Sequence, residues 1–254
     1  MAKVLFSWRN LIDQAALIPS SEVPGLGVNN LKVPQIAKVW RSVEGAAHVD
    51  IDFGEADEIG VVAFAQPNDG PLLPRQATVR HQFSLTATGL SDVHDGGLIP
   101  AGVVQRYGYH FYQPPTPITA RYWRMSIRAP AWFQIGRLWA GPVWRPRKNY
   151  GFGWTRRWVS GTKPVASERS LIQYADEGAR AREITLPFGA LGGADADIAD
   201  DMLFDVGTNG QLLICLDPDS PERKTMIGTL VEAPLTTQRH LPAHQVTYTA
   251  IESR

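Results

Sequence analysis

The residues from Thr119 to Pro146 constrain the fold more than any other stretch of this chain. From Trp123 to Arg128, apolar and polar side chains alternate, which is the period of a strand with one buried and one solvent-facing side. Ala129-Pro130 interrupts the pattern, a second apolar strand runs from Phe133 to Trp139, and Gly141-Pro142 ends it. The stretch therefore predicts two strands that close one β-domain, with a second domain after it.

The same alternation occurs earlier in the chain. From Ala47 to Phe53 every second residue is apolar, and Ala77 to Ala87 alternates again. The inward-facing residues of the later strand are predicted to be Val79, Phe83 and Leu85. With 23 glycines and 19 prolines, the chain is also rich in turns, as all-β chains tend to be. These patterns predict a mainly all-β protein.

Composition narrows the classes of function. The 25 basic and 25 acidic side chains cancel, so no global field attracts nucleic acid or an anionic membrane. No apolar run approaches the roughly 20 residues of a membrane span, and the first residues lack the apolar core of a signal peptide. Synthesis in a cytoplasm is therefore expected. The single Cys215 lies in an apolar run and is predicted to be a buried small hydrophobe.

The residues after 142 predict a second β-domain with one helix. Apolar side chains recur at helical spacing between about Ala194 and Val206, and Gly207 fits a C-terminal cap. Ser170 to Tyr174 and Arg182 to Phe188 are predicted to be the arms of an antiparallel hairpin that turns near Asp176 to Gly178. The predicted domains are residues 1–142 and 143–254.

The order of these strands carries a resemblance to a known family. An Asn-Leu loop, a Trp-Arg-Ser, the strands H-V-D-I-D-F-G and I-G-V-V-A-F, and finally A-R-Y-W-R-M-S-I and F-Q-I-G-R-L-W-A-G-P follow in turn. Over roughly residues 20 to 142 this succession resembles the discoidin (coagulation factor 5/8 type C) jelly roll. The resemblance implies a jelly-roll β-sandwich whose loops at one end bind sugars or lipid head groups.

A second resemblance concerns the junction and the C-terminal part. The run Q-I-G-R-L-W-A-G-P-V-W-R-P into Y-G-F-G-W-T-R-R-W-V, and later Q-L-L-I-C-L-D-P-D and M-I-G-T-L-V-E, is similar to minor tail or baseplate proteins of tailed bacteriophages. This implies a tail-tube-like or distal-tail-like β-sandwich after the jelly roll. It also implies a structural virion protein, made in the bacterial host cytoplasm, that forms a six-fold or three-fold ring between tail tube, hub and fibre proteins.

Basic and aromatic side chains are interleaved at the junction. Such a mixture serves either a contact between subunits, where arginine stems cover aromatic faces, or single-stranded nucleic acid. The neutral charge and the lack of a nucleic-acid motif favour the subunit contact. The predicted interface residues are Arg145, Arg147, Trp154, Arg156, Arg157 and Trp158.

An aromatic cluster is the candidate ligand site, because sugar rings stack on exposed aromatic faces. Its residues are Tyr107, Tyr109, His110 and Tyr112. If they face solvent, the protein is a carbohydrate-binding or receptor-binding module that contacts a glycan of the host cell envelope. The alternative is that these rings pack within a sheet or an interface.

No pattern in the chain predicts catalysis, a metal or a cofactor. There is no G-x-S-x-G elbow, and Pro242 argues against a helix that would align His240 with His244. Two loops, with Asp92, His94 and Asp95 in one and Asp217, Asp219 and Glu222 in the other, have oxygen ligands for Ca²⁺ but read as ordinary turns. We therefore expect a protein that is not an enzyme.

Overall fold

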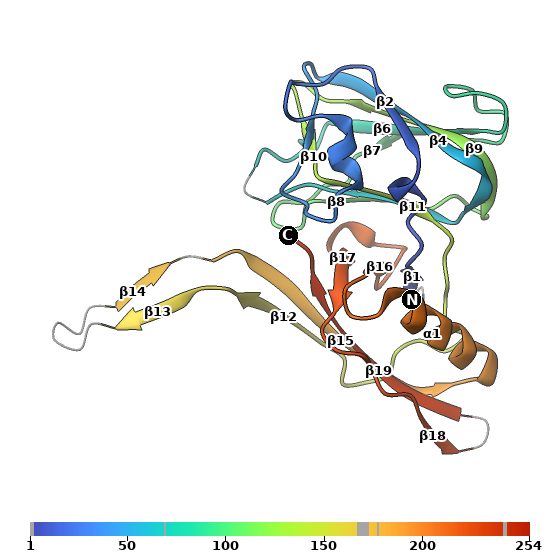
Figure 1. Ribbon diagram of the computed structural model, residues 1–254, viewed down its shortest axis with the longest axis vertical. Coiled ribbons are helices and arrows are strands. Elements are labelled where there is room, and N and C mark those ends of the chain that lie inside the picture. The colour runs from blue at the N-terminus through green and yellow to red at the C-terminus, as the bar shows by residue number, and fades with distance from the viewer. Residues whose placement is uncertain (1–2, 69, 167–172, 177, 241–242) are drawn as a thin grey trace. The chain divides into compact units, whose positions relative to one another are not determined.

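The computed structural model describes residues 3–68, 70–166, 173–176, 178–240 and 243–254 (Figure 1). These residues are mainly β-strands, with one α-helix of 14 residues among them. The predicted all-β class with a single helix is confirmed. No helix in this described part of the chain is long and apolar enough to cross a membrane.

The chain divides into two compact units. The first comprises residues 1–146 and 211–227, and the second comprises residues 147–210 and 228–254. The sequence predicted one division after residue 142. The structure differs because β16 (Gln211–Cys215) pairs antiparallel with β1 (Leu5–Ser7), which makes residues 211–227 part of the first unit. β17 (Thr225–Leu230) lies across this boundary.

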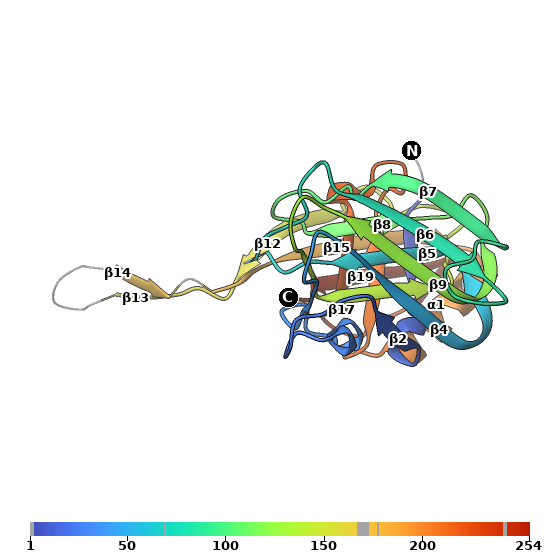
Figure 2. The same ribbon diagram turned by 90° about the horizontal axis from the view of Figure 1, so that it is seen from above.

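The first unit contains two main sheets. The five-stranded sheet has the order β2 (Ala16–Pro19), β4 (Ala46–Ile59), β9 (Ile118–Arg128), β6 (Thr78–Ser84), β7 (His94–Pro100), and its strands lie side by side in Figure 2. The three-stranded sheet has the order β11 (Arg137–Gly141), β5 (Val61–Ala65), β8 (Tyr109–Tyr112). The remaining short elements are β3 (Trp40–Arg41), its partner β10 (Gln134–Ile135), and the 3₁₀ helices η1 (Leu11–Asp13), η2 (Val28–Lys32) and η3 (Pro221–Arg223).

The inner faces of these two sheets share one hydrophobic core, so the first unit is a β-sandwich. Trp123, Met125 and Ile127 of β9 are at most 1% exposed, as the alternation predicted. Phe64 of β5 and Leu138 of β11 belong to the same core from the facing sheet. The sandwich thus follows directly from the alternation that the sequence shows.

The outer face of the five-stranded sheet carries charged pairs between neighbouring strands. Asp50 of β4 lies opposite Arg124 of β9, and the Arg124 Nη2 to Asp50 Oδ2 distance is 2.7 Å. Asp52 accepts two bonds from Arg121, at 2.9 and 3.0 Å. One predicted inward residue is wrong: Leu85 is 50% exposed, because β6 ends at Ser84 and the alternation ends with it.

The second unit is built around two long strands. β15 (Arg180–Leu191) pairs with β19 (Ala243–Glu252) on one edge and with β12 (Thr155–Ser160) on the other. β18 (Thr237–His240) and the end of β17 pair with β19. A separate hairpin joins β13 (Lys163–Ala166) to β14 (Gln173–Asp176).

The predicted hairpin of Ser170 to Tyr174 with Arg182 to Phe188 is wrong. β14 pairs with β13, and β15 pairs with β12, so the two predicted arms have other partners. Local alternation shows that a segment is a strand, but it does not identify the strand beside it. Residues 170–172 and 177 of this prediction lie outside the described residues.

The helix α1 (Gly193–Val206) agrees with its prediction. Its apolar side turns Ala199, Met202 and Val206 inward, and it packs against β19 (Figure 1). At its start, the main-chain N–H of Arg147 donates to the Asp195 carboxylate at 2.9 Å. Gly207 has a positive φ of 54° and ends the helix, as expected of a C-terminal glycine.

Candidate functional site

The structure separates the four residues of the predicted aromatic cluster. Tyr109 and His110 of β8 are each only 2% exposed, so neither ring can present a face to a ligand. This corrects the prediction for these two residues, and His110 is buried because it stacks on Phe64 in the neighbouring strand. Tyr107 and Tyr112 are half-buried, and the Arg223 guanidinium lies 5.8 Å from the Tyr107 ring centre.

A network of histidines lies behind Tyr112. The Nδ1 of His110 is 2.6 Å from the Ala101 carbonyl oxygen, so this nitrogen carries the proton and donates. The Nε2 of His110 must then accept from the Nε2 of His81, 2.9 Å away. His81 Nδ1 is buried and has no hydrogen-bond partner among the described residues. For neutral rings, these distances assign the proton to Nδ1 in His110 and to Nε2 in His81.

Burial sets the charge state of this network. Burial lowers the pKa of His110 to about 4, against the opposing effect of its bond to Ala101. Burial, followed by the neighbouring His110 and His94, lowers the pKa of His81 well below its ordinary value. Both rings are therefore neutral at pH 7. The sequence contained a signal for His81, which has the same parity as the inward-facing Val79 and Phe83.

Tyr112 is held in place by this network. Its hydroxyl oxygen is 2.6 Å from His94 Nε2, and its ring stacks on His81 with the centres 4.8 Å apart. Burial raises the pKa of Tyr112, and the negative charge of Asp95 adds to the rise. The phenol is thus a fixed, uncharged ring at neutral pH that packs against the core of the first unit.

An open groove of about 340 Å³ lies beside Tyr112, within the first unit. Three segments that are distant in sequence form it: the end of β8, the exit from β11, and the loop between β16 and η3. Its lining residues are Phe111, Tyr112, Gln113, Pro114, Pro115, Arg145, Pro218, Asp219 and Pro221. Phe111 and Tyr112 are consecutive residues of β8, so their side chains point to opposite faces of the sheet, and the Tyr112 ring is the one that stacks on buried His81. Phe111 and four prolines therefore surround three polar side chains.

The polar side chains of the groove are held by specific contacts. Arg145 Nη2 donates to the Gln113 side-chain oxygen. In the opposite wall, Lys224 Nζ lies 2.5 Å from Asp217 Oδ2, and this hydrogen bond is the main reason why the pKa of Asp217 is lowered. Asp217 in turn accepts from the main-chain N–H of Asp219 at 3.3 Å. The loop thereby presents the exposed Asp219 to the groove.

Only one of the predicted interface residues, Arg145, lies in this groove. The others lie in the second unit, from Arg147 onward. Arg157 Nε donates to Glu183 at 2.7 Å, and the Arg254 guanidinium is 5.8 Å from the Trp158 ring centre. Trp154 and Trp158 are 41% and 45% exposed. The structure thus assigns Arg145 to the first unit and the other five predicted interface residues to the second.

In each of the two loops that were considered for Ca²⁺, an acidic side chain forms an ion pair with a basic side chain. Asp95 pairs with Arg80, and Asp217 pairs with Lys224. Within the described ranges, no three His, Cys, Asp or Glu side chains are grouped as a metal site requires. Cys215 is fully buried, as predicted, and burial raises the pKa of its thiol to about 11, which disfavours the reactive thiolate.

Comparison with known proteins gives matches in structure alone. No protein-family model matches the chain, and no curated protein matches it. Similar solved structures cover about half of this chain, 53%, and nearly all of their own length.

Three of these structures are sugar-binding modules. A fucose-binding module of Streptococcus pneumoniae has 10% identity and a TM-score of 0.44, with 98% of its chain covered. A family 32 module of C. perfringens NanJ in complex with galactose has 10% identity and a TM-score of 0.42, with 98% covered. A chitosan-binding module of a Paenibacillus sp. IK-5 chitosanase/glucanase has 17% identity and a TM-score of 0.42, with 99% covered.

Proposed function

We propose that this protein is a carbohydrate-binding module whose sugar occupies the groove beside Tyr112. The observation that carries the proposal is the meeting of one aromatic residue, Phe111, and four prolines with the polar side chains of Gln113, Arg145 and Asp219. The proposal involves binding only, with no catalytic step. It applies to the first unit of the chain.

The chemistry of the groove suits a sugar ring. Aromatic and proline surfaces accept the C–H face of a sugar, while a carboxylate, an amide and a guanidinium bind its hydroxyl groups. Both signs of charge are present, since Arg145 faces the groove together with Asp219. The side chains therefore offer donors and acceptors in one small space, which a polyol can satisfy together.

A glycan array followed by calorimetry tests this proposal. The first sugars to include are fucose, galactose and chitosan oligomers, which are the ligands named for the similar modules. Asp219→Asn and Gln113→Ala should each weaken binding roughly ten-fold, the effect of losing a hydrogen bond to a charged or buried group. Arg128→Gln changes an exposed residue of β9 outside the groove and should leave affinity unchanged.

The variants test where the sugar binds, and the array tests whether the protein binds sugar. Sugar binding that Asp219→Asn and Gln113→Ala leave intact would place the ligand elsewhere on the molecule. No binding on an array of cell-surface and cell-wall glycans would reject the proposal itself. Heteronuclear NMR spectra of each variant establish that the fold is retained, so that a loss of binding is not a loss of structure.

A second candidate function is a structural role in a phage tail tip, as a ring-forming component between tube, hub and fibre proteins. The observation that favours it is the exposed aromatic surface of the second unit, where Phe152 is fully exposed and Trp154 and Trp158 nearly half exposed. Exposed aromatics beside arginines are typical of contact surfaces between proteins. The protein would then be part of the virion, and the sugar groove could serve contact with the host envelope.

Mass and symmetry measurements test this second candidate. Light scattering and negative-stain averaging of the purified chain should show a three-fold or six-fold ring. Trp154→Ser and Trp158→Ser together should dissociate that ring while leaving sugar binding by the first unit unchanged. If the chain binds sugar but is a monomer at all concentrations, the ring-forming role is rejected and only the carbohydrate-binding function remains.

A further inference from the structure

One edge of the long strand β19 is interrupted in the second unit. On this edge the Val231 N–H donates to the Thr249 carbonyl oxygen at 2.9 Å, where the partner segment leaves the strand. Pairing resumes where Thr237 of β18 lies opposite Gln245. Thr247 lies between these two contacts, at a gap where β19 has no neighbouring strand on this edge among the described residues.

The main-chain groups of Thr247 face this gap. On the other side of β19, Thr247 lies opposite Pro187, which has no N–H to donate. The Pro187 carbonyl accepts from Gly151 at 2.7 Å, so it points away from β19. Since alternate residues of a strand direct N–H and C=O to the same edge, Thr247 shares the direction of Thr249. One N–H and one C=O therefore point together into the gap.

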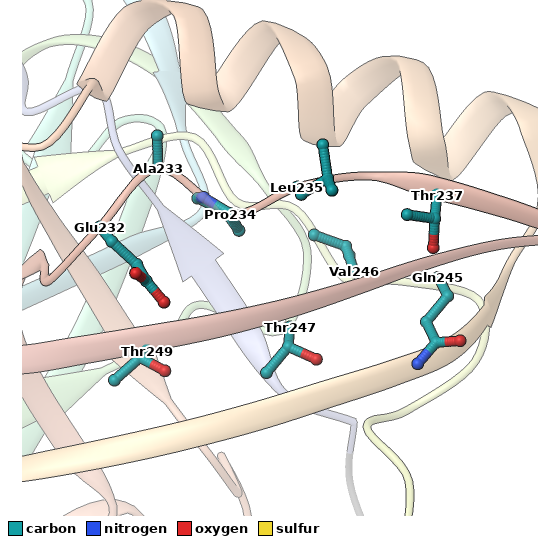
Figure 3. Close-up of a pocket in the computed structure, with 9 residues that line it drawn as sticks. All are labelled: Glu232, Ala233, Pro234, Leu235, Thr237, Gln245, Val246, Thr247 and Thr249. Carbon is teal, nitrogen blue, oxygen red and sulfur yellow. The ribbon is translucent and has the colours of Figure 1, made fainter.

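A cavity of about 390 Å³ occupies the gap. Figure 3 shows its lining: the segment with Ala233, Pro234 and Leu235 runs along one side, and β19 runs along the other. Its polar side chains are Glu232, Thr237, Gln245, Thr247 and Thr249. All but one are neutral, and hydroxyl groups predominate.

We propose that this cavity is a second saccharide site, which holds two adjacent hydroxyl groups of a neutral sugar against the main chain of Thr247. One hydroxyl accepts from the Thr247 N–H, and its neighbour donates to the Thr247 C=O. Neighbouring ring hydroxyls can do both because each is donor and acceptor at once. The Thr237 and Gln245 side chains then bind the remaining hydroxyls.

A compact ring fits this gap better than an extended peptide. A peptide that adds to a sheet edge needs several consecutive open positions. Here β17 and β18 occupy the edge on both sides of Thr247, so only one position is open. The apolar Pro234 and Leu235 offer a surface for the C–H face of the ring. The cavity volume is also within the range of small-ligand sites.

This inference extends the proposed function, but it depends on different residues in a different unit. The test is NMR titration of the isotope-labelled full chain with the methyl glycosides of glucose, galactose and mannose, which differ in the arrangement of neighbouring hydroxyls. Titration to about 50 mM detects dissociation constants in the millimolar range. We expect the Thr247 amide resonance to shift saturably with at least one of them.

Variants separate this site from the groove. Thr237→Val keeps the side-chain shape, removes one hydroxyl and should weaken the shift-derived affinity roughly ten-fold. Thr229→Val, in β17 outside the cavity, is the matched control and should change affinity less than two-fold. Asp219→Asn should weaken binding at the groove roughly ten-fold and leave the shifts around Thr247 intact.

The outcomes are distinct. Shifts at Thr247 that persist when groove binding is absent would support this site and reject the groove. Shifts confined to the groove residues, with none at Thr247 for any of the three glycosides, would overturn the inference. Equal effects of Thr237→Val and Thr229→Val would overturn it too, since the cavity hydroxyl would then not matter.

Discussion

Each unit buries a different kind of fully enclosed titratable pair. In the first unit, His81 and His110 lie together in the core as neutral rings. In the second unit, Arg182 and Glu252 are buried as an ion pair, 2% and 0% exposed in their side chains, with Arg182 Nη2 and Glu252 Oε1 2.6 Å apart. Arg254 adds a second cation 2.5 Å from Glu252 Oε2.

This difference determines what each core tolerates. A neutral histidine pair loses stability when a proton is added, because burial penalises the charged form. A buried ion pair loses stability when one partner is removed, because the other charge remains without compensation. Three measurements test this difference between the two pairs.

The largest effect is expected for Glu252→Gln. This change leaves Arg182 and Arg254 without their carboxylate and should lower the free energy of unfolding by about 3 kcal/mol. Hydrogen exchange in β15 and β19 and chemical denaturation are the measurements. Glu183→Gln is the matched control: Glu183 is the neighbour of Arg182 in β15, its partner Arg157 in β12 is 69% exposed, and the change should cost less than about 1 kcal/mol. Equal losses would contradict the distinction between buried and exposed pairs.

The next effect is acid sensitivity of the first unit. The unfolded state binds protons at the ordinary histidine pKa of 6.5, whereas folded His110 binds them only near pH 4. The free energy of unfolding should therefore fall as the pH decreases below 6.5, by about 3 kcal/mol at pH 4 for His110 alone. Urea denaturation at a series of pH values, with hydrogen exchange in β6 and β8, measures this slope.

Variants on β6 test the origin of that slope. His81→Phe removes one of the two rings and should make the loss of stability below pH 6.5 less steep. Phe83→Leu, on the same face of the same strand, should lower stability at every pH and leave the slope unchanged. An unchanged slope in His81→Phe would assign the acid sensitivity to other groups.

The smallest effect is expected for charged pairs on the outer sheet face. A double-mutant cycle with Asp50→Asn and Arg124→Gln should give a coupling of about 0.2 to 1 kcal/mol that weakens with added salt. The pKa of Arg124 is raised chiefly by its hydrogen bond to Asp50, in agreement with a favourable contact. A coupling as large as the loss in Glu252→Gln would erase the contrast between core and surface.

Sequence reasoning predicted the candidate site in part. It identified Tyr112 and Arg145, yet it assigned them to two different roles, and it noted Asp219 only as a turn residue. The groove exists because the end of β8, the exit of β11 and the loop after β16 converge. Such convergence depends on strand pairing between distant segments, which local periodicity does not encode.

The local features of this protein could be predicted from its sequence. The alternation of apolar and polar residues predicted the buried face of β9. Helical spacing and Gly207 predicted α1, and the apolar run around Cys215 predicted that this residue is buried. These properties depend on residues within a few positions of each other, where the period of the backbone decides which side chains share a face.

The contacts between distant segments became visible only in the folded structure. It joined β16 to β1, brought His81 within 2.9 Å of His110, and left the gap beside Thr247 in the edge of β19. Each of these depends on which strands become neighbours and in what register. That choice is made by the packing of the whole core, in which residues far apart in sequence compete for the same partners.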